Sequence, residues 1–123
     1  MRVLLSIKPE YANKIFDGTK KFEFRKILFK NPEVKTVVVY ASSPVQKVIG
    51  EFEIEKILSL TPELLWEKTC HFSGISSKFF FEYFADRSVA HAIEIKSTKK
   101  YKEPRSIKEE YNAIPPQSFL YLT

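Results

Sequence analysis

The stretch Gly18-Thr19-Lys20-Lys21-Phe22-Glu23-Phe24-Arg25 places a glycine, two lysines, a carboxylate and an arginine around two phenylalanines. Apolar residues at every second position predict a β-strand, here over residues 20–26, with one buried face. On such a strand Lys21, Glu23 and Arg25 share the opposite face. Fixed charges of both signs on one rigid strand suit a ligand that carries phosphate oxygens together with a hydrogen-bond donor.

The sequence on either side of this stretch predicts short strands separated by short helices. Strands are expected at residues 2–7, 37–41, 48–58, 89–95 and 119–122. Helices are expected to begin near Pro9, Thr61, Ser76 and Ser106, which are residue types favoured at helix starts, and the first helix is expected to stop at Gly18. About five or six strands with three or four helices predict a single α+β domain over residues 1–123, built around a small β-barrel.

Charge is unevenly distributed along the chain, whose formal net charge is +5. Residues 1–47 contain ten Lys or Arg and four Asp or Glu, residues 48–95 contain four and eight, and residues 96–123 contain six and three. A basic start and end around an acidic middle favour one basic face and an anionic partner, with nucleic acid as the first candidate. Solubility alone is the other explanation of the basic excess.

The densest basic stretch lies near the end of the chain and surrounds Tyr101. It contains Lys96, Lys99, Lys100, Lys102, Arg105 and Lys108. Basic residues around an aromatic residue suit single-stranded nucleic acid, and a solvated loop is the equally weighted alternative.

The pattern G-x-K-x-x-E-x-R, read here at Gly18, Lys20, Glu23 and Arg25, resembles the signature of the ASCH family, a branch of the PUA-like superfold. Residues 6–11, 40–44, 48–52 and 116–119 look like this family as well, so the resemblance covers nearly the whole chain. It implies a PUA-like small barrel with a cleft between the barrel and the helix that follows its first strand.

The resemblance implies a module that binds RNA or a nucleotide in this cleft and that regulates transcription or translation. The residues expected to contact the ligand are the charged and hydroxyl side chains near the motif: Lys8, Lys20, Lys21, Glu23, Arg25, Ser42, Ser43 and Lys47. Without the resemblance, the motif would be interpreted as a ladder of surface ion pairs, which contributes little stability. The two serines would then be turn residues that precede Pro44.

The motif lysine raises a question of register. Strict alternation places Lys20 on the same strand face as Phe22 and Phe24, away from Glu23. Lys20 therefore lies in the turn before the strand becomes regular, or a bulge turns it toward Glu23. If neither holds, Lys21 takes the ligand-facing role.

An enzyme is the alternative to a binding module. A branch related to the ASCH family hydrolyses acetylated cytidine with a lysine, a threonine and a glutamate, but its threonine position corresponds to Glu23 here. Some ASCH proteins resemble ribonucleases, and Lys20 with Glu23 would then form an acid–base pair acting on a ribose hydroxyl. A protein-interaction domain is the third hypothesis, which no motif favours.

Several functional classes receive no support from the sequence. His71 and His91 have no second His or Cys at metal-ligand spacing, so no metal site is predicted. No phosphate-binding glycine loop or dinucleotide fingerprint occurs, so no cofactor is predicted. No apolar run approaches the roughly 20 residues that span a bilayer, which predicts no membrane partner. A lone cysteine, Cys70, fits a reducing compartment, so we expect a cytoplasmic protein.

Overall fold

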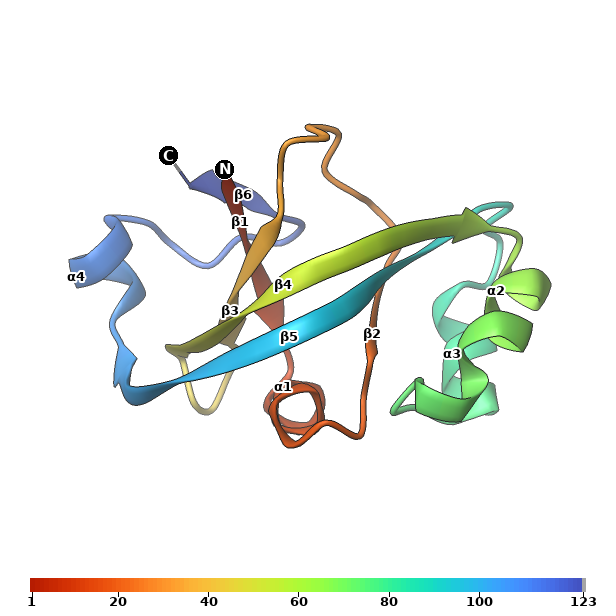
Figure 1. Ribbon diagram of the computed structural model, residues 1–123, viewed down its shortest axis with the longest axis horizontal. Helices are drawn as coiled ribbons and strands as arrows, with labels where there is room; N and C mark the ends of the chain where they lie inside the picture. Colours follow the sequence, from red (N-terminus) through yellow and green to blue (C-terminus); the bar gives the residue numbers. More distant parts are fainter. Residues whose placement is uncertain (123) are drawn as a thin grey trace.

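The computed structural model describes residues 1–122 and places six strands in one sheet with helices at both ends and below it (Figure 1). The elements in chain order are β1 (Arg2–Ile7), α1 (Pro9–Asp17), β2 (Phe22–Arg25), β3 (Thr36–Ala41), β4 (Lys47–Leu60), α2 (Pro62–Thr69), the short 3₁₀ helix η1 (Cys70–Phe72), α3 (Ser77–Tyr83), β5 (Ala90–Arg105), α4 (Ile107–Tyr111) and β6 (Leu120–Leu122). The strand order is β2-β5-β4-β3-β1-β6. The predicted α+β class is therefore confirmed.

The helix ends follow from local sequence, as expected. Helix α1 begins at Pro9, and Gly18 ends it in the left-handed conformation at φ 88°, which glycine adopts without steric cost. The side chains of Thr61, Ser76 and Ser106 each accept a hydrogen bond from the backbone N–H three residues further along the chain, in the helix that follows. These short helices thereby start at defined residues, which positions them against the sheet.

The closed barrel expected from the sequence is not confirmed, because the sheet is not closed. Within residues 1–122 its outer strands, β2 and β6, do not pair with each other. Register shifts in the β4–β5 pairing near Gly50 and Ile54 bend the sheet, as β-bulges do, so that its two ends approach each other. Strand β2 has only four residues and pairs with β5 alone. The remaining opening is bridged by the Arg25 side chain, described below.

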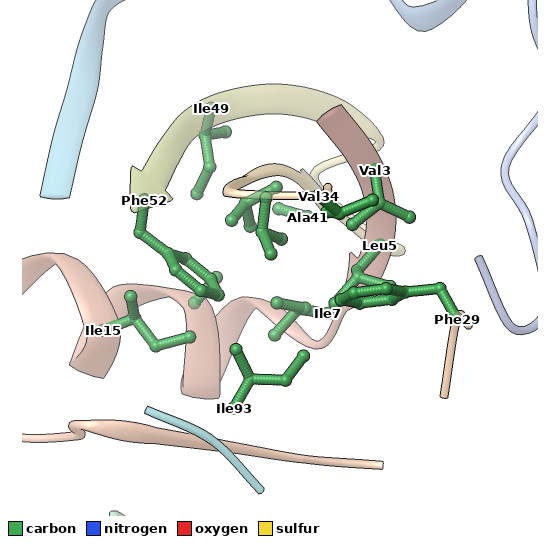
Figure 2. Packing of buried hydrophobic residues seen from close by; sticks show 13 residues of the cluster. Val3, Leu5, Ile7, Ile15, Phe29, Val34, Ala41, Ile49, Phe52 and Ile93 are labelled. Atoms are coloured by element: carbon green, nitrogen blue, oxygen red, sulfur yellow. The ribbon is translucent and has the colours of Figure 1, made fainter. Parts of the chain in front are cut away.

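The main core fills the concave side of the bent sheet. Figure 2 shows aliphatic and aromatic side chains from β1, β3, β4, β5 and α1 meeting there, with Phe52 and Phe29 packed among Val, Leu and Ile residues. A second cluster lies under α4 and includes Tyr101. A third packs Phe22 and Phe24 of β2 against Phe80 and Phe84 of the α3 region. The first and third clusters hold α1, β2 and α3 at fixed positions around one hollow.

Candidate functional site

A hollow of about 210 Å³ lies where β1, α1, β2 and α3 meet, and we call it the motif pocket. Four charged side chains line it, namely Lys8, Lys20, Glu23 and Arg25. Three of the four are cationic, so the pocket has a net positive charge when all are ionised. It lies beside α1 and β2, in the region where the family resemblance implies a cleft.

Lys20 is buried at the bottom of this arrangement, with 2% of its surface exposed. Strand β2 begins only at Phe22, so Lys20 lies in the turn before the strand, which was the first of the expected alternatives. Its Nζ donates a hydrogen bond of 2.6 Å to the backbone oxygen of Ser73 and lies 4.7 Å from the ring centre of Phe24. The amine therefore faces the motif pocket and not bulk water.

Burial lowers the pKa of Lys20 from 10.5 to about 8, and the nearby Glu23 carboxylate partly opposes this shift. The cause is desolvation, because a buried ammonium loses the hydration that stabilises its charge. An amine with this pKa is present in both its protonated and its neutral form at a pH slightly above neutral. Strongly perturbed ionisable groups inside a pocket are characteristic of functional sites.

The segment Phe72–Gly74 covers Lys20 from above and is held there by hydrogen bonds from the motif region. Lys14 Nζ donates to the backbone oxygen of Gly74 at 3.1 Å, and the Lys21 backbone N–H donates to that of Phe72 at 2.8 Å. Gly74 has φ +71°, and a Cβ built on it would lie 2.7 Å from Cβ and Cγ of Lys20. A glycine at position 74 is thus required for the close approach that buries the lysine stem.

Replacing Gly74 by alanine is expected to destabilise the fold by about 2–5 kcal/mol, from left-handed backbone strain plus overpacking against Lys20. Urea unfolding measures this loss, and NMR titration of the Lys20 ammonium should show a changed pKa. Gly18→Ala is the matched control, because Gly18 has φ +88° but no atom within 4 Å of an added Cβ. Equal losses from the two variants would contradict the role assigned to Gly74.

Glu23 and Arg25 form the ion pair of the pocket, with Arg25 Nη1 3.2 Å from Glu23 Oε2. Arg25 also donates to two backbone oxygens from other parts of the chain, that of Ser6 at 3.3 Å and that of Ser118 at 2.7 Å. Ser6 belongs to β1 and Ser118 precedes β6, so this one guanidinium joins β2 to the far end of the sheet. Arg25 therefore orients Glu23 and bridges the opening of the sheet at the same time.

An aromatic wall faces the charged side of the pocket and consists of Tyr11, Phe79 and Tyr83. The rings of Phe79 and Tyr83 are nearly parallel, at an interplanar angle of 10° and a centroid distance of 6.1 Å. Tyr11 packs against Phe79 at 5.7 Å. Partly exposed aromatic faces beside cations are surfaces on which a planar ring can stack.

A family model of the ASCH domain matches residues 5–115 of this chain. The chain belongs to the ASCH domain family. The segment matched includes the whole G-x-K-x-x-E-x-R motif and every residue of the motif pocket named above. The family assignment made from the sequence is thereby confirmed.

Similar proteins differ in how much of their length this chain spans. The chain is 28% identical over 122 residues to an ASCH domain-containing ribonuclease of Zymomonas mobilis, covering 97% of this chain and 82% of that protein. It is 37% identical over 121 residues to an ATP synthase subunit alpha of Ureaplasma parvum serovar 3, covering 98% of this chain. It spans only 15% of the length of that relative.

The crystal structure of ASCH from Zymomonas mobilis has the same fold. It superposes with a TM-score of 0.91 at 28% sequence identity, covering 99% of this chain and 87% of that one. The open six-stranded sheet with its four α-helices is therefore the architecture of an ASCH domain and not a peculiarity of this sequence.

Half of the ligand-contact residues expected from the sequence lie outside the motif pocket of this ASCH domain. Lys21 is exposed, and its Nζ lies 4.9 Å from the ring centre of Phe72. Ser42, Ser43 and Lys47 lie in or next to the β3–β4 turn and do not line the motif pocket. The turn is nevertheless adjacent, because the Ser42 backbone N–H donates to the oxygen of Ile7, which does line the pocket.

The aromatic wall and the Phe72–Gly74 cover were not found by sequence reasoning. The phenylalanine-rich helix α3 divides its aromatic side chains between the core and the pocket. Phe80 is in the core, Phe79 and Tyr83 face the pocket, and Phe81 is exposed but does not line it. The spacing of four residues between Phe79 and Tyr83, which places both on one helix face, was the available signal.

Residues 1–122 contain no group of three or more His, Cys, Asp or Glu side chains arranged to hold a metal ion. None of the helices described is long and apolar enough to cross a membrane.

Proposed function

We propose that this ASCH domain binds RNA and that the motif pocket receives one unpaired nucleotide. The observation that carries the proposal is Lys20, a lysine that is 2% exposed and directed into a hollow with a net positive charge. Burying an ammonium is costly unless something compensates for it. A lysine kept there at such a cost is more readily explained by a ligand than by stability.

The groups around the hollow match the parts of a nucleotide. Aromatic faces such as those of Phe79 and Tyr83 stack on any base. Lys8 and Lys20 supply cations for a phosphate, and Glu23 accepts a hydrogen bond from a base amino group or a ribose hydroxyl. Arg25 contacts the ligand only at the pocket edge, because its main role is to hold Glu23. A domain that regulates transcription or translation would act through RNA binding of this kind.

Binding of labelled single-stranded RNA at several salt concentrations tests the proposal. Affinity is expected to fall with salt, with a log–log slope of about 0.7 for each phosphate neutralised. The matched pair of variants is Lys20→Met and Lys68→Met, since Lys68 is exposed on α2 and far from the motif in sequence. A salt-independent affinity, or equal affinities of the two variants, would refute RNA binding in this pocket.

RNA cleavage is the second candidate function, favoured by the pKa of about 8 at Lys20. In this reaction Glu23 accepts the proton of a ribose 2′-hydroxyl, whose oxygen attacks the adjacent phosphorus. The 5′-oxygen then leaves with a proton from the Lys20 ammonium, and a 2′,3′-cyclic phosphate forms. A relative of this chain is named a ribonuclease, which supports testing the same chemistry here.

Incubation of purified protein with end-labelled RNA distinguishes binding from cleavage. The native protein is expected to release fragments that end in a cyclic phosphate, and a strand with 2′-deoxy sugars should stay intact. Lys20→Met and Glu23→Gln should each lower the rate by about 10²–10⁴-fold. Equal rates for all three proteins would show that the pocket does not carry out the cleavage.

A further inference from the structure

A second, larger hollow lies at the α4 end of the sheet and has a volume of about 720 Å³. Its lining includes five cationic side chains and three carboxylates, so it too has a net positive charge. The cationic residues, which we call the basic surface, are Lys47, Lys99, Lys100, Lys102 and Arg105.

An irregularity in the β4–β5 pairing creates this surface. Val48 pairs with Arg105 and Gly50 pairs with Lys100, so residues 101–104 have only Ile49 opposite them. The extra residues form a bulge within β5, in which Lys102, Glu103 and Pro104 are exposed. Strand β5 thus continues to Arg105, beyond the strand expected at residues 89–95. The lysines of the densest basic stretch of the sequence that belong to this surface are therefore exposed to solvent.

This bulged part of β5 is held in place by Tyr101. Tyr101 is buried in the cluster under α4, and its hydroxyl donates a hydrogen bond of 2.8 Å to Glu51. The Arg105 guanidinium lies 3.8 Å from the centre of the Tyr101 ring. The salt bridge found within residues 1–122 is that of Glu23 with Arg25 in the motif pocket, so no lysine of the basic surface forms one. Their charges are therefore available to a partner.

The basic surface and the motif pocket are joined by the β3–β4 turn. Ile7 lines the pocket and accepts a hydrogen bond from Ser42 at the start of the turn. Lys47 at its end pairs with Ala41 and lines the second hollow. Figure 1 shows this turn between α1 and the connection from β5 to α4. An RNA strand that leaves the motif pocket past Ser42 and Ser43 would reach Lys47 next.

We infer that the basic surface binds the phosphates of the RNA that flanks the nucleotide in the motif pocket. The inference rests on the proposed function and names its ligand class: a single-stranded RNA of several nucleotides, not a free nucleotide. A base enters a small hollow only when it is unpaired, which excludes a regular duplex at that point. Flexible, unpaired lysines are suited to a backbone whose conformation varies with sequence.

The test compares Lys47→Ala/Lys99→Ala/Lys100→Ala with Lys35→Ala/Lys56→Ala/Lys68→Ala. All six lysines are exposed, and the control set lines neither hollow, so both triple variants lose the same charge and should keep the native unfolding transition. For an eight-nucleotide RNA, loss of three phosphate contacts should lower the salt slope by about 2 and the affinity at 0.1 M salt by up to about 100-fold. Binding of a nucleoside monophosphate, followed by NMR shifts, should stay unchanged.

The outcomes separate the two proposals. If both triple variants bind the octamer equally well, the basic surface does not bind RNA, although the pocket proposal stands. If the basic-surface variant loses the octamer while Lys20→Met retains it, the surface proposal stands and the pocket proposal fails. If the native protein binds neither the octamer nor longer RNA but captures an acidic protein, both proposals are wrong.

Discussion

The Lys20→Met variant is expected to lose about 10- to 100-fold in RNA affinity, which is the effect of removing one charged hydrogen-bond donor from a ligand contact. The free energy of unfolding of this variant is also expected to change less with pH than that of the native protein. Methionine fills nearly the same space as the lysine stem and contacts Phe24 and Tyr11 without burying a charge. Function and stability should therefore change independently.

The pH dependence follows from the two pKa values of Lys20, 10.5 when unfolded and about 8 when folded. Below pH 8 both states carry the proton and the native protein suffers the full desolvation penalty. Between pH 8 and 10.5 the unfolded state binds more protons, so the native protein becomes more stable relative to Lys20→Met as pH rises. The total gain is about 3 kcal/mol.

Urea unfolding of both proteins at several pH values from 7 to 10.5 measures this difference directly. Other tyrosines and lysines titrate in the same range, but they are common to both proteins and cancel in the comparison. Lys68→Met should show no such trend, because Lys68 is exposed. A stability difference between Lys20→Met and the native protein that stays constant with pH would show that Lys20 is not buried in solution.

Arg25→Leu is expected to give the largest loss of stability, about 3–5 kcal/mol, because it leaves the buried Glu23 carboxylate without its partner. The backbone oxygens of Ser6 and Ser118 lose a donor in the same substitution. Since these contacts bridge the two ends of the sheet, amides of β6 should also exchange faster with solvent. Urea unfolding and hydrogen exchange measure the two effects.

A double variant separates the charge from the bridge. Glu23→Gln/Arg25→Leu removes the unpaired carboxylate but leaves the opening unbridged, so we expect it to be more stable than Arg25→Leu and less stable than the native protein. Arg87→Leu is the control, because Arg87 is exposed beyond α3. If Arg25→Leu is no less stable than Arg87→Leu, the bridge contributes nothing to the fold.

Much of the local structure could be predicted because it depends on neighbouring residues. The N-caps at Thr61 and Ser106 and the helix stop at Gly18 are made within three or four residues of chain, so the sequence displays both partners together. The buried strand at residues 37–41 was also recognised, because an unbroken apolar run fits a strand covered on both faces.

The candidate site could be predicted only in part. The charged residues Lys20, Glu23 and Arg25 lie close in sequence and were found as a group. Their partners were not, because the Lys20 contact with Ser73 and the Arg25 contact with Ser118 join residues 53 and 93 positions apart. No periodicity in the sequence connects such pairs, and Phe79 could not be told from Phe80 without the sheet against which α3 packs.

The sequence by itself determined where most of the helices and strands begin, the family of the domain, and the charged motif that helps to line the pocket. Those properties depend on apolar periodicity, capping residues and residue type, which act over a few positions. Only the tertiary structure decided that the sheet stays open, that a guanidinium bridges its ends, and that Lys20 is buried beneath Gly74. These features arise where distant segments pack together, and the desolvation of one amine exists only once that packing excludes water.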